Sequence, residues 1–167
     1  MLKECCMKLF KTYSGLMALL LISPWVLAQN VSVSNAWARA SVKGQNATGV
    51  FMSLKAVGPT KLVAVNSSVA HVSEIHQMSM QNNVMKMTAL PNGLVLDAGS
   101  VVDLKPGGYH IMLMDLKKTL EKDSNIDLQL TFQDATGKKT QVDMRVPVLL
   151  QATEGQKGMQ GAEHQHH

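Results

Sequence analysis

Apolar and polar residues alternate along most of the chain between residues 31 and 148, in short runs separated by turn-forming residues. Because side chains of a β-strand point alternately to opposite faces, this period of two is typical of strands rather than helices. Many short strands at this spacing indicate an all-β domain built as a Greek-key sandwich or barrel. The predicted strands cover residues 31–38, 48–57, 61–67, 72–80, 84–90, 100–104, 110–116, 126–132 and 141–148.

The first 28 residues have the pattern of an export signal. Lys3, Lys8 and Lys11 form a positive segment, an apolar run follows at residues 15–22, and the segment Pro24-Trp25-Val26-Leu27-Ala28 ends the pattern with a helix breaker and a small residue before the cut. The apolar run is shorter than the roughly 20 residues that span a bilayer, which favours a cleaved signal over a retained anchor. We therefore predict cleavage after Ala28, a periplasmic protein, and membrane contact only through the signal.

The C-terminal end also lacks the strand pattern. From residue 151 onward Gln, Glu, Gly and His dominate, so we predict a flexible tail at 151–167 after a globular β domain at 29–150. His164, His166 and His167 give this tail nitrogen donors suited to oxidised copper, and we predict a secondary Cu(II) site there. Terminal His clusters can also be remnants of expression, but His-Gln-His-His is not a regular tag.

Composition narrows the chemistry of the exported domain. Both cysteines, Cys5 and Cys6, lie in the predicted signal and precede its apolar run, which argues against a lipid anchor and leaves the domain no thiolate. Aromatic residues make up only 4% of the chain, whereas there are 12 methionines. The formal net charge is +4, but no cluster of basic and aromatic residues suggests nucleic-acid binding. Methionine and histidine keep their ligand character in an oxidising compartment, so these residues are the candidates for a metal site.

Histidine and methionine concentrate in two segments. If Asn82-Asn83 forms a two-residue hairpin turn, Met78 lies opposite Met87 and Met80 opposite Met85. These side chains then share a face with His76, which is a diagonal neighbour of Met87. In the second segment, the spacing of two residues puts His110 and Met112 on one face of a strand.

These donors favour a soft cation. Thioether sulfur binds hard cations poorly, and the combination of thioether with imidazole favours Cu(I). Zinc would ordinarily use cysteine, histidine or carboxylate, and Glu74 is the only carboxylate near by on the same strand face. A blue-copper centre would need a cysteine ligand. We find no nucleophile and base arrangement, phosphate loop or Cys-x-x-Cys motif, and so predict that the protein is not an enzyme.

At these residues the sequence resembles the periplasmic copper chaperone family called PCu(A)C, whose motif is His, ten residues, Met, about twenty-one residues, then His-x-Met. Here ten residues separate His76 from Met87, and twenty-two separate Met87 from His110. The additional residue is most simply placed in the turn at Pro91-Asn92-Gly93. The resemblance also includes Lys105-Pro106-Gly107-Gly108-Tyr109 and implies a cupredoxin-like fold with His76, Met87, His110 and Met112 as copper ligands.

The remaining histidines, methionines and aromatic residues receive simpler interpretations. His71 has the opposite parity to His76 and is expected on the surface. Met78, Met80 and Met85 are either auxiliary donors or an apolar collar around the site. We expect core or rim positions for Met52, Met114 and Met144, and core packing for Trp37 and Phe51.

The sequence thus predicts a copper chaperone that holds Cu(I) at a His2Met2 site and transfers it by ligand exchange. The resemblance implies an acceptor copper protein, either a cytochrome oxidase subunit or a factor that assembles its copper centres. Two alternatives stay open: a copper buffer or resistance protein without a dedicated acceptor, and a purely structural β domain.

Overall fold

The computed structural model describes residues 30–150, which form an all-β domain of ten strands. Within this range no helix is long and apolar enough to cross a membrane. The predicted signal peptide and the predicted C-terminal tail lie outside the described residues. The strands are β1 (Val31–Arg39), β2 (Ala47–Ala56), β3 (Thr60–Ser67), β4 (Ala70–Gln81), β5 (Val84–Ala89), β6 (Leu94–Leu96), β7 (Val101–Leu104), β8 (Tyr109–Leu116), β9 (Asn125–Asp134) and β10 (Lys139–Leu149).

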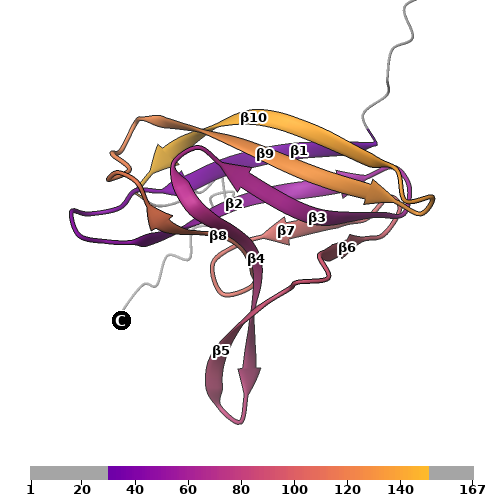
Figure 1. Ribbon diagram of the computed structural model, residues 1–167. Coiled ribbons are helices and arrows are strands. Elements are labelled where there is room, and N and C mark those ends of the chain that lie inside the picture. Colours follow the sequence, from indigo (N-terminus) through magenta and orange to yellow (C-terminus); the bar gives the residue numbers. More distant parts are fainter. Residues whose placement is uncertain (1–29, 151–167) are drawn as a thin grey trace, which may run out of the picture.

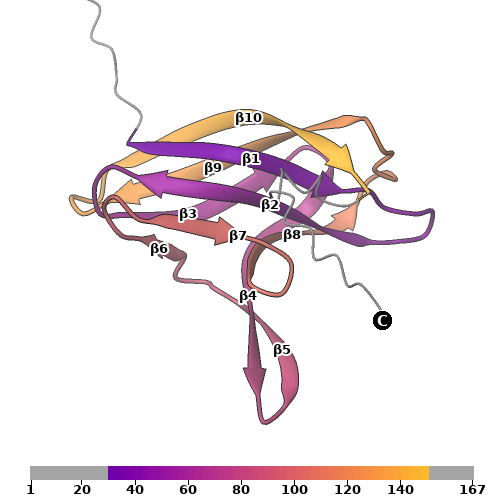
Figure 2. The ribbon, with the colours of Figure 1, turned by 180° about the vertical axis from the view of Figure 1, so that it is seen from behind.

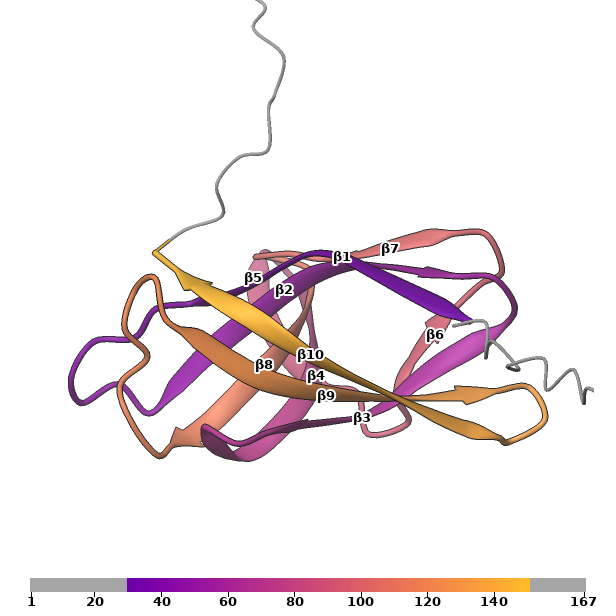
Figure 3. The ribbon, with the colours of Figure 1, turned by 90° about the horizontal axis from the view of Figure 1, so that it is seen from above.

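The strands make two layers of one continuous sheet (Figures 1 and 3). The first layer has the order β5-β4-β8-β7-β2-β1, and β2 also pairs with β8. The second layer has the order β10-β9-β3-β6. A parallel pairing between β1 and β10, at Ala38 with Val148 and Arg39 with Leu149, joins the two layers. Neighbours in the sheet that are distant in sequence, such as β2 and β8, give the predicted sandwich topology.

The hydrophobic core lies between the two layers. Alternate residues of β2, from Val50 through Met52 and Leu54 to Ala56, are buried there, as are Ile75 of β4 and Ile111 of β8. Fully burying one large apolar side chain contributes about 1.5–3 kcal/mol. Successive side chains of a strand point to opposite faces, so the residues between these core positions in β2, β4 and β8 face outward from the first layer. This outer face is available for a site.

The nine predicted strands are all present, with ends within two residues of those expected. The sequence did not predict β6, whose three residues follow directly after the turn at Pro91-Asn92-Gly93. A strand this short shows only one alternation, but Leu94 and Leu96 are buried and pair with β3. Gly93 has a φ of 78°, and a Cβ at this position would overlap the carbonyl oxygen of Leu62. The turn therefore requires glycine to bring β6 against β3.

The hairpin of β4 and β5 projects beyond the sandwich (Figures 1 and 2). Pairing of β4 with β8 ends at Gln77 with Tyr109, and from there β4 continues with only β5 beside it. The turn residues Asn82 and Asn83 have φ values of 50° and 61°, as a two-residue hairpin turn of primed type requires. The predicted register, with Met78 opposite Met87 and Met80 opposite Met85, is confirmed.

Candidate metal centre

Two histidines from distant parts of the chain meet on the outer face of the first layer. His76 of β4 lies directly opposite His110 of β8 in the antiparallel ladder. Their ring centroids are 5.8 Å apart, with an angle of 63° between the ring planes. His76 is 9% exposed and His110 is 5% exposed, although both point away from the core. Two buried imidazoles are therefore held side by side by the pairing of the strands.

His110 is oriented by the turn that precedes β8. Its Nδ1–H donates a hydrogen bond of 3.1 Å to the carbonyl oxygen of Gly108. Hydrogen bonds from Gly108 N to Lys105 O, at 3.0 Å, and from Lys105 N to Tyr109 O, at 2.8 Å, close the turn. Because the proton is on Nδ1, the lone pair of Nε2 is available to a metal ion.

His76 is oriented by a carboxylate. Its Nε2 lies 2.8 Å from Oε2 of Glu74, so Nε2–H donates and the Nδ1 lone pair is available. Among side-chain nitrogen and oxygen atoms of the described residues, His76 Nδ1 is the one that is buried without a hydrogen-bond partner. Leaving such an atom unpaired costs about 1–3 kcal/mol. A bound cation would satisfy this atom.

The separation of the two rings suits a shared ion. A metal–nitrogen bond is about 2.0–2.1 Å long, and a ring nitrogen lies roughly 1.2 Å from its centroid, so two imidazoles on one ion have centroids at most roughly 6.5 Å apart. The observed 5.8 Å lies within this limit. The spacing of the two rings is therefore compatible with one ion bound between them.

The two predicted thioether ligands occupy neighbouring positions on the same face. Met112 is half-buried, lies two residues after His110, and pairs with Glu74 on β4. Met87 is 44% exposed and pairs with Met78, two residues beyond His76. The register thus places two imidazoles and two thioethers on one face of three adjacent strands.

Burial favours the neutral form of His110. Desolvation lowers the pKa of its imidazole below the usual value of 6.5, the hydrogen bond to Gly108 raises it in part, and the proximity of His76 lowers it further. A neutral imidazole is the metal-binding form, so little proton competition is expected at neutral pH.

Two aromatic residues form a wall beside His110. The Trp37 and Phe51 ring centroids are 4.6 Å apart, those of Phe51 and His110 are 6.4 Å apart, and the Arg39 guanidinium lies 5.5 Å from the Phe51 centroid. Trp37 and Phe51 are buried, as expected, and they pack against each other on the outer face of the first layer, apart from the hydrophobic cluster between the two layers. An irregularity of β1 between Ser34 and Trp37 changes its parity and turns Trp37 outward.

Three of the other residues interpreted from the sequence lie where they were expected. His71 is exposed, Met52 is in the core, and Met144 packs against the core from the second layer. Sequence reasoning missed that Glu74 hydrogen-bonds His76 and that Phe51 and Arg39 lie beside His110. The shared parity of Glu74 and His76 could have indicated the first contact, whereas the others depend on the order of strands.

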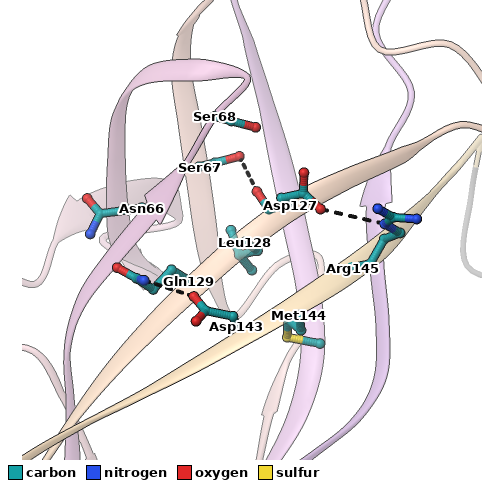
Figure 4. A pocket seen from close by; sticks show the side chains of 9 residues that line it. All are labelled: Asn66, Ser67, Ser68, Asp127, Leu128, Gln129, Asp143, Met144 and Arg145. Atoms are coloured by element: carbon teal, nitrogen blue, oxygen red, sulfur yellow. Dashed lines mark hydrogen bonds and ion pairs between the residues drawn. The ribbon is translucent and has the colours of Figure 1, made fainter.

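The described residues offer no second metal site built from carboxylates, histidines and cysteines. Across residues 30–150 there is no group of three or more His, Cys, Asp or Glu side chains that could hold a metal ion. A hollow of about 540 Å³ lies on the second layer, and no histidine is among the residues that line it (Figure 4). Several of its polar groups are paired with each other, as in Gln129 with Asp143 at 2.8 Å and Arg145 with Asp127 at 3.6 Å. The histidine and methionine face is therefore the candidate metal centre.

Known proteins with similar sequences are described as lipoproteins or are uncharacterised. The family model "LpqE-like: Putative lipoprotein LpqE-like" matches residues 31–148. "Putative lipoprotein Lxx21020" of Leifsonia xyli subsp. xyli (strain CTCB07) is 34% identical over 136 residues, 81% of each chain. "Uncharacterized protein RP573" of Rickettsia prowazekii (strain Madrid E) is 33% identical over 78 residues, 47% of this chain and 43% of that protein.

Solved structures with a similar fold are PCuAC domains and a protein of Deinococcus radiodurans. The apo PCuAC domain from PmoF1 has a TM-score of 0.55 and 23% identity, covering 72% of this chain and 95% of that one. The copper-bound PCuAC domain from PmoF2 has a TM-score of 0.54 and 20% identity, covering 72% and 94%. Apo-DR1885 from Deinococcus radiodurans has a TM-score of 0.54 and 22% identity, covering 87% and 95%. The fold of the described domain is thus all-β and cupredoxin-like.

Proposed function

The chain belongs to the LpqE-like family, and from this membership and the geometry of its histidine pair we propose that it is a copper chaperone. The ligands of Cu(I) are His76, Met87, His110 and Met112. The observation that carries the proposal is the buried, unpartnered Nδ1 of His76 beside His110, on a face that offers thioethers and no cysteine.

The donor set explains the choice of cation. Two imidazoles and two thioethers are neutral and soft, and they suit Cu(I) better than Zn(II). Two solved structures with this fold contain copper, the copper-bound PCuAC domain from PmoF2 and CuI-DR1885. These two proteins support copper as the cargo of this chain.

The exposure of the ligands favours transfer rather than permanent storage. Both histidines are buried, but Met87 is 44% exposed on a strand that pairs only with β4. A donor of the acceptor protein can approach the ion from the side of Met87, form a bond, and displace one thioether while the histidines still hold the ion. Copper remains Cu(I) throughout, so no electron donor or acceptor is needed.

We propose that the acceptor is a protein that builds the copper centres of cytochrome oxidase, a proposal supported by the resemblance to PCu(A)C chaperones. The lipoprotein names of the family and of the Leifsonia relative support export, and we place the chain in the periplasm after cleavage of residues 1–28. The tail histidines His164, His166 and His167 are proposed to collect Cu(II) outside the Cu(I) site.

The experiment that tests this function is a competition titration of the protein without residues 1–28. Cu(I) or Zn(II) is added against a chelator of known affinity, and we expect one tightly bound Cu(I) and much weaker Zn(II). Tighter binding of Zn(II) would overturn the copper assignment. Mixing the loaded protein with an apo oxidase copper domain then distinguishes a chaperone, which transfers faster than copper dissociates, from a buffer, which transfers at the dissociation rate.

A further inference from the structure

The projecting part of the β4–β5 hairpin has two chemically different faces. Cross-strand partners point to the same side of a hairpin, so Met78, Met80, Met85 and Met87 share one face. The opposite face is mostly polar, with Gln77, Ser79, Gln81, Lys86 and Thr88. We call the first of these, defined by its four methionines, the methionine face.

The methionine pairs occupy the ladder positions at which side chains come closest. Leu90 N–H donates to Ile75 O at 2.8 Å, so positions 75 and 90 form a hydrogen-bonded pair of the antiparallel ladder. Pairs alternate in type, which makes Met78 with Met87 and Met80 with Met85 non-hydrogen-bonded pairs. Met78 N–H agrees with this assignment, because it donates to Gly108 O on the other side of β4. In such pairs the Cα atoms are only about 4.5 Å apart.

The methionines near the end of the hairpin are not explained by a role in packing the hydrophobic core. Met80 is 62% exposed and Met85 is 47% exposed, and β5 has no second neighbouring strand. The two methionine pairs are separated by two residues along each strand, or about 6.8 Å. Flexible methionine side chains from both pairs can reach across this distance and meet. Three thioethers can thus converge on one point near the end of the hairpin.

We propose that Met78, Met80 and Met85 form a second binding site, selective for soft monovalent cations such as Cu(I) and Ag(I). Its donors are all neutral thioethers, and Lys86, the nearest cationic side chain on the hairpin, points to the other face. Without an imidazole and with greater exposure, this site binds more weakly than the histidine site.

The position of Met87 connects the two sites. It pairs with Met78 and is the diagonal neighbour of both His76 and Met80. A cation can therefore move from the hairpin end toward the histidines as one sulfur–metal bond forms and another breaks, with no change of oxidation state. This role as a relay rests on the proposed function, whereas binding at the hairpin end does not.

The test uses Ag(I), which is not oxidised in air, and the protein without residues 1–28 carrying ¹³C-labelled methionine methyl groups. In NMR spectra we expect the first equivalent of Ag(I) to shift the methyl signals of Met87 and Met112. The second equivalent should shift those of Met78, Met80 and Met85. The double variant M80L/M85L keeps the apolar surface and should lose at least tenfold in affinity for the second equivalent, with the first unchanged within twofold.

Two further variants make the result decisive. M144L, which changes a methionine of the second layer, is the matched control and should bind both equivalents as the wild type does. H110A should lose the first equivalent and keep the shifts of Met80 and Met85, so a failure of the histidine site is distinguished from a failure of the hairpin site. Methyl signals of Met80 and Met85 that do not move with excess Ag(I), or a second equivalent that binds M80L/M85L as tightly as the wild type, would overturn the proposal.

Discussion

His76 and His110 face each other across the β4–β8 ladder, and each ring is oriented by the residue two positions before it. For His76 that partner is the carboxylate of Glu74, and for His110 it is the backbone carbonyl of Gly108. One nitrogen of each imidazole is thus fixed as a donor, and the other is left for the cation. Of the two orienting contacts, only the one to Glu74 can be removed by changing a side chain.

Removing a proposed ligand should weaken Cu(I) binding strongly. H110A deletes an imidazole from the pair, and M112L replaces a thioether by an apolar group of similar size, so each should lose at least tenfold in affinity, about 1.4 kcal/mol. The control is H71A, which changes an exposed histidine on β4 and should stay within twofold. Chelator competition measures all three. Equal losses in H71A and H110A would show that the ligand assignment is wrong.

Glu74 should act on the site through His76. Removal of a carboxylate that orients a metal-binding histidine typically costs about 10- to 100-fold in metal affinity, and we expect E74A to fall in this range. E74Q keeps an oxygen acceptor near Nε2 and should lose less. E121Q, a charge change at an exposed loop residue, controls for the altered net charge. If E74A binds Cu(I) as E121Q does, the 2.8 Å contact has no role in binding.

The hairpin was predictable because its information is local. Two consecutive asparagines tolerate the left-handed conformation, the turn fixes the register, and the register fixes which methionines face each other. The pairing of His76 with His110 is different, because it requires β4 and β8 to be neighbours in the sheet. Nothing near either residue encodes that adjacency, which follows from packing the whole sandwich.

The position of Trp37 shows another limit of sequence reasoning. Strict alternation from Val31 and Val33 would put the ring of Trp37 between the two layers. Asn35 instead adopts a φ of 53°, the register shifts before Trp37, and the ring turns outward toward Phe51. A single asparagine in a strand gives too weak a signal to predict such an irregularity.

The lowered pKa of His110 should make the stability of the metal-free protein depend on pH. The unfolded chain binds a proton at this histidine near pH 6.5, whereas the folded protein binds it only at lower pH. The free energy of unfolding therefore falls as pH drops below about 6.5, by at most about 1.4 kcal/mol per pH unit for this group. Urea denaturation between pH 7.5 and 5 should give a shallower pH dependence for H110Q than for the wild type. The same change in H71Q as in H110Q would contradict this assignment.

Gly49 should position the aromatic wall beside His110. It pairs with Met112, and a Cβ at Gly49 would lie 2.8 Å from Cζ of Phe51. G49A should displace the Phe51 ring, at a cost of about 1–3 kcal/mol in the free energy of unfolding. Chemical denaturation measures this loss, and the tryptophan fluorescence of Trp37 should change with it. G58A is the control, because a Cβ there meets no atom within 4 Å. Equal stability of G49A and G58A would show that the contact is not needed.

The predicted tail should bind Cu(II) independently of the Cu(I) site. Oxidised copper favours nitrogen and oxygen donors, and Glu163, His164, His166 and His167 supply them on a segment with too little apolar content to fold alone. Deletion of residues 151–167 removes no residue of the described strands, the last of which ends at Leu149. The truncated protein should lose Cu(II) binding, measured by electron paramagnetic resonance, and keep its stability and its Cu(I) affinity. A tenfold loss of Cu(I) affinity, about 1.4 kcal/mol, would instead show that Met159 or a tail histidine closes over the site as an additional ligand.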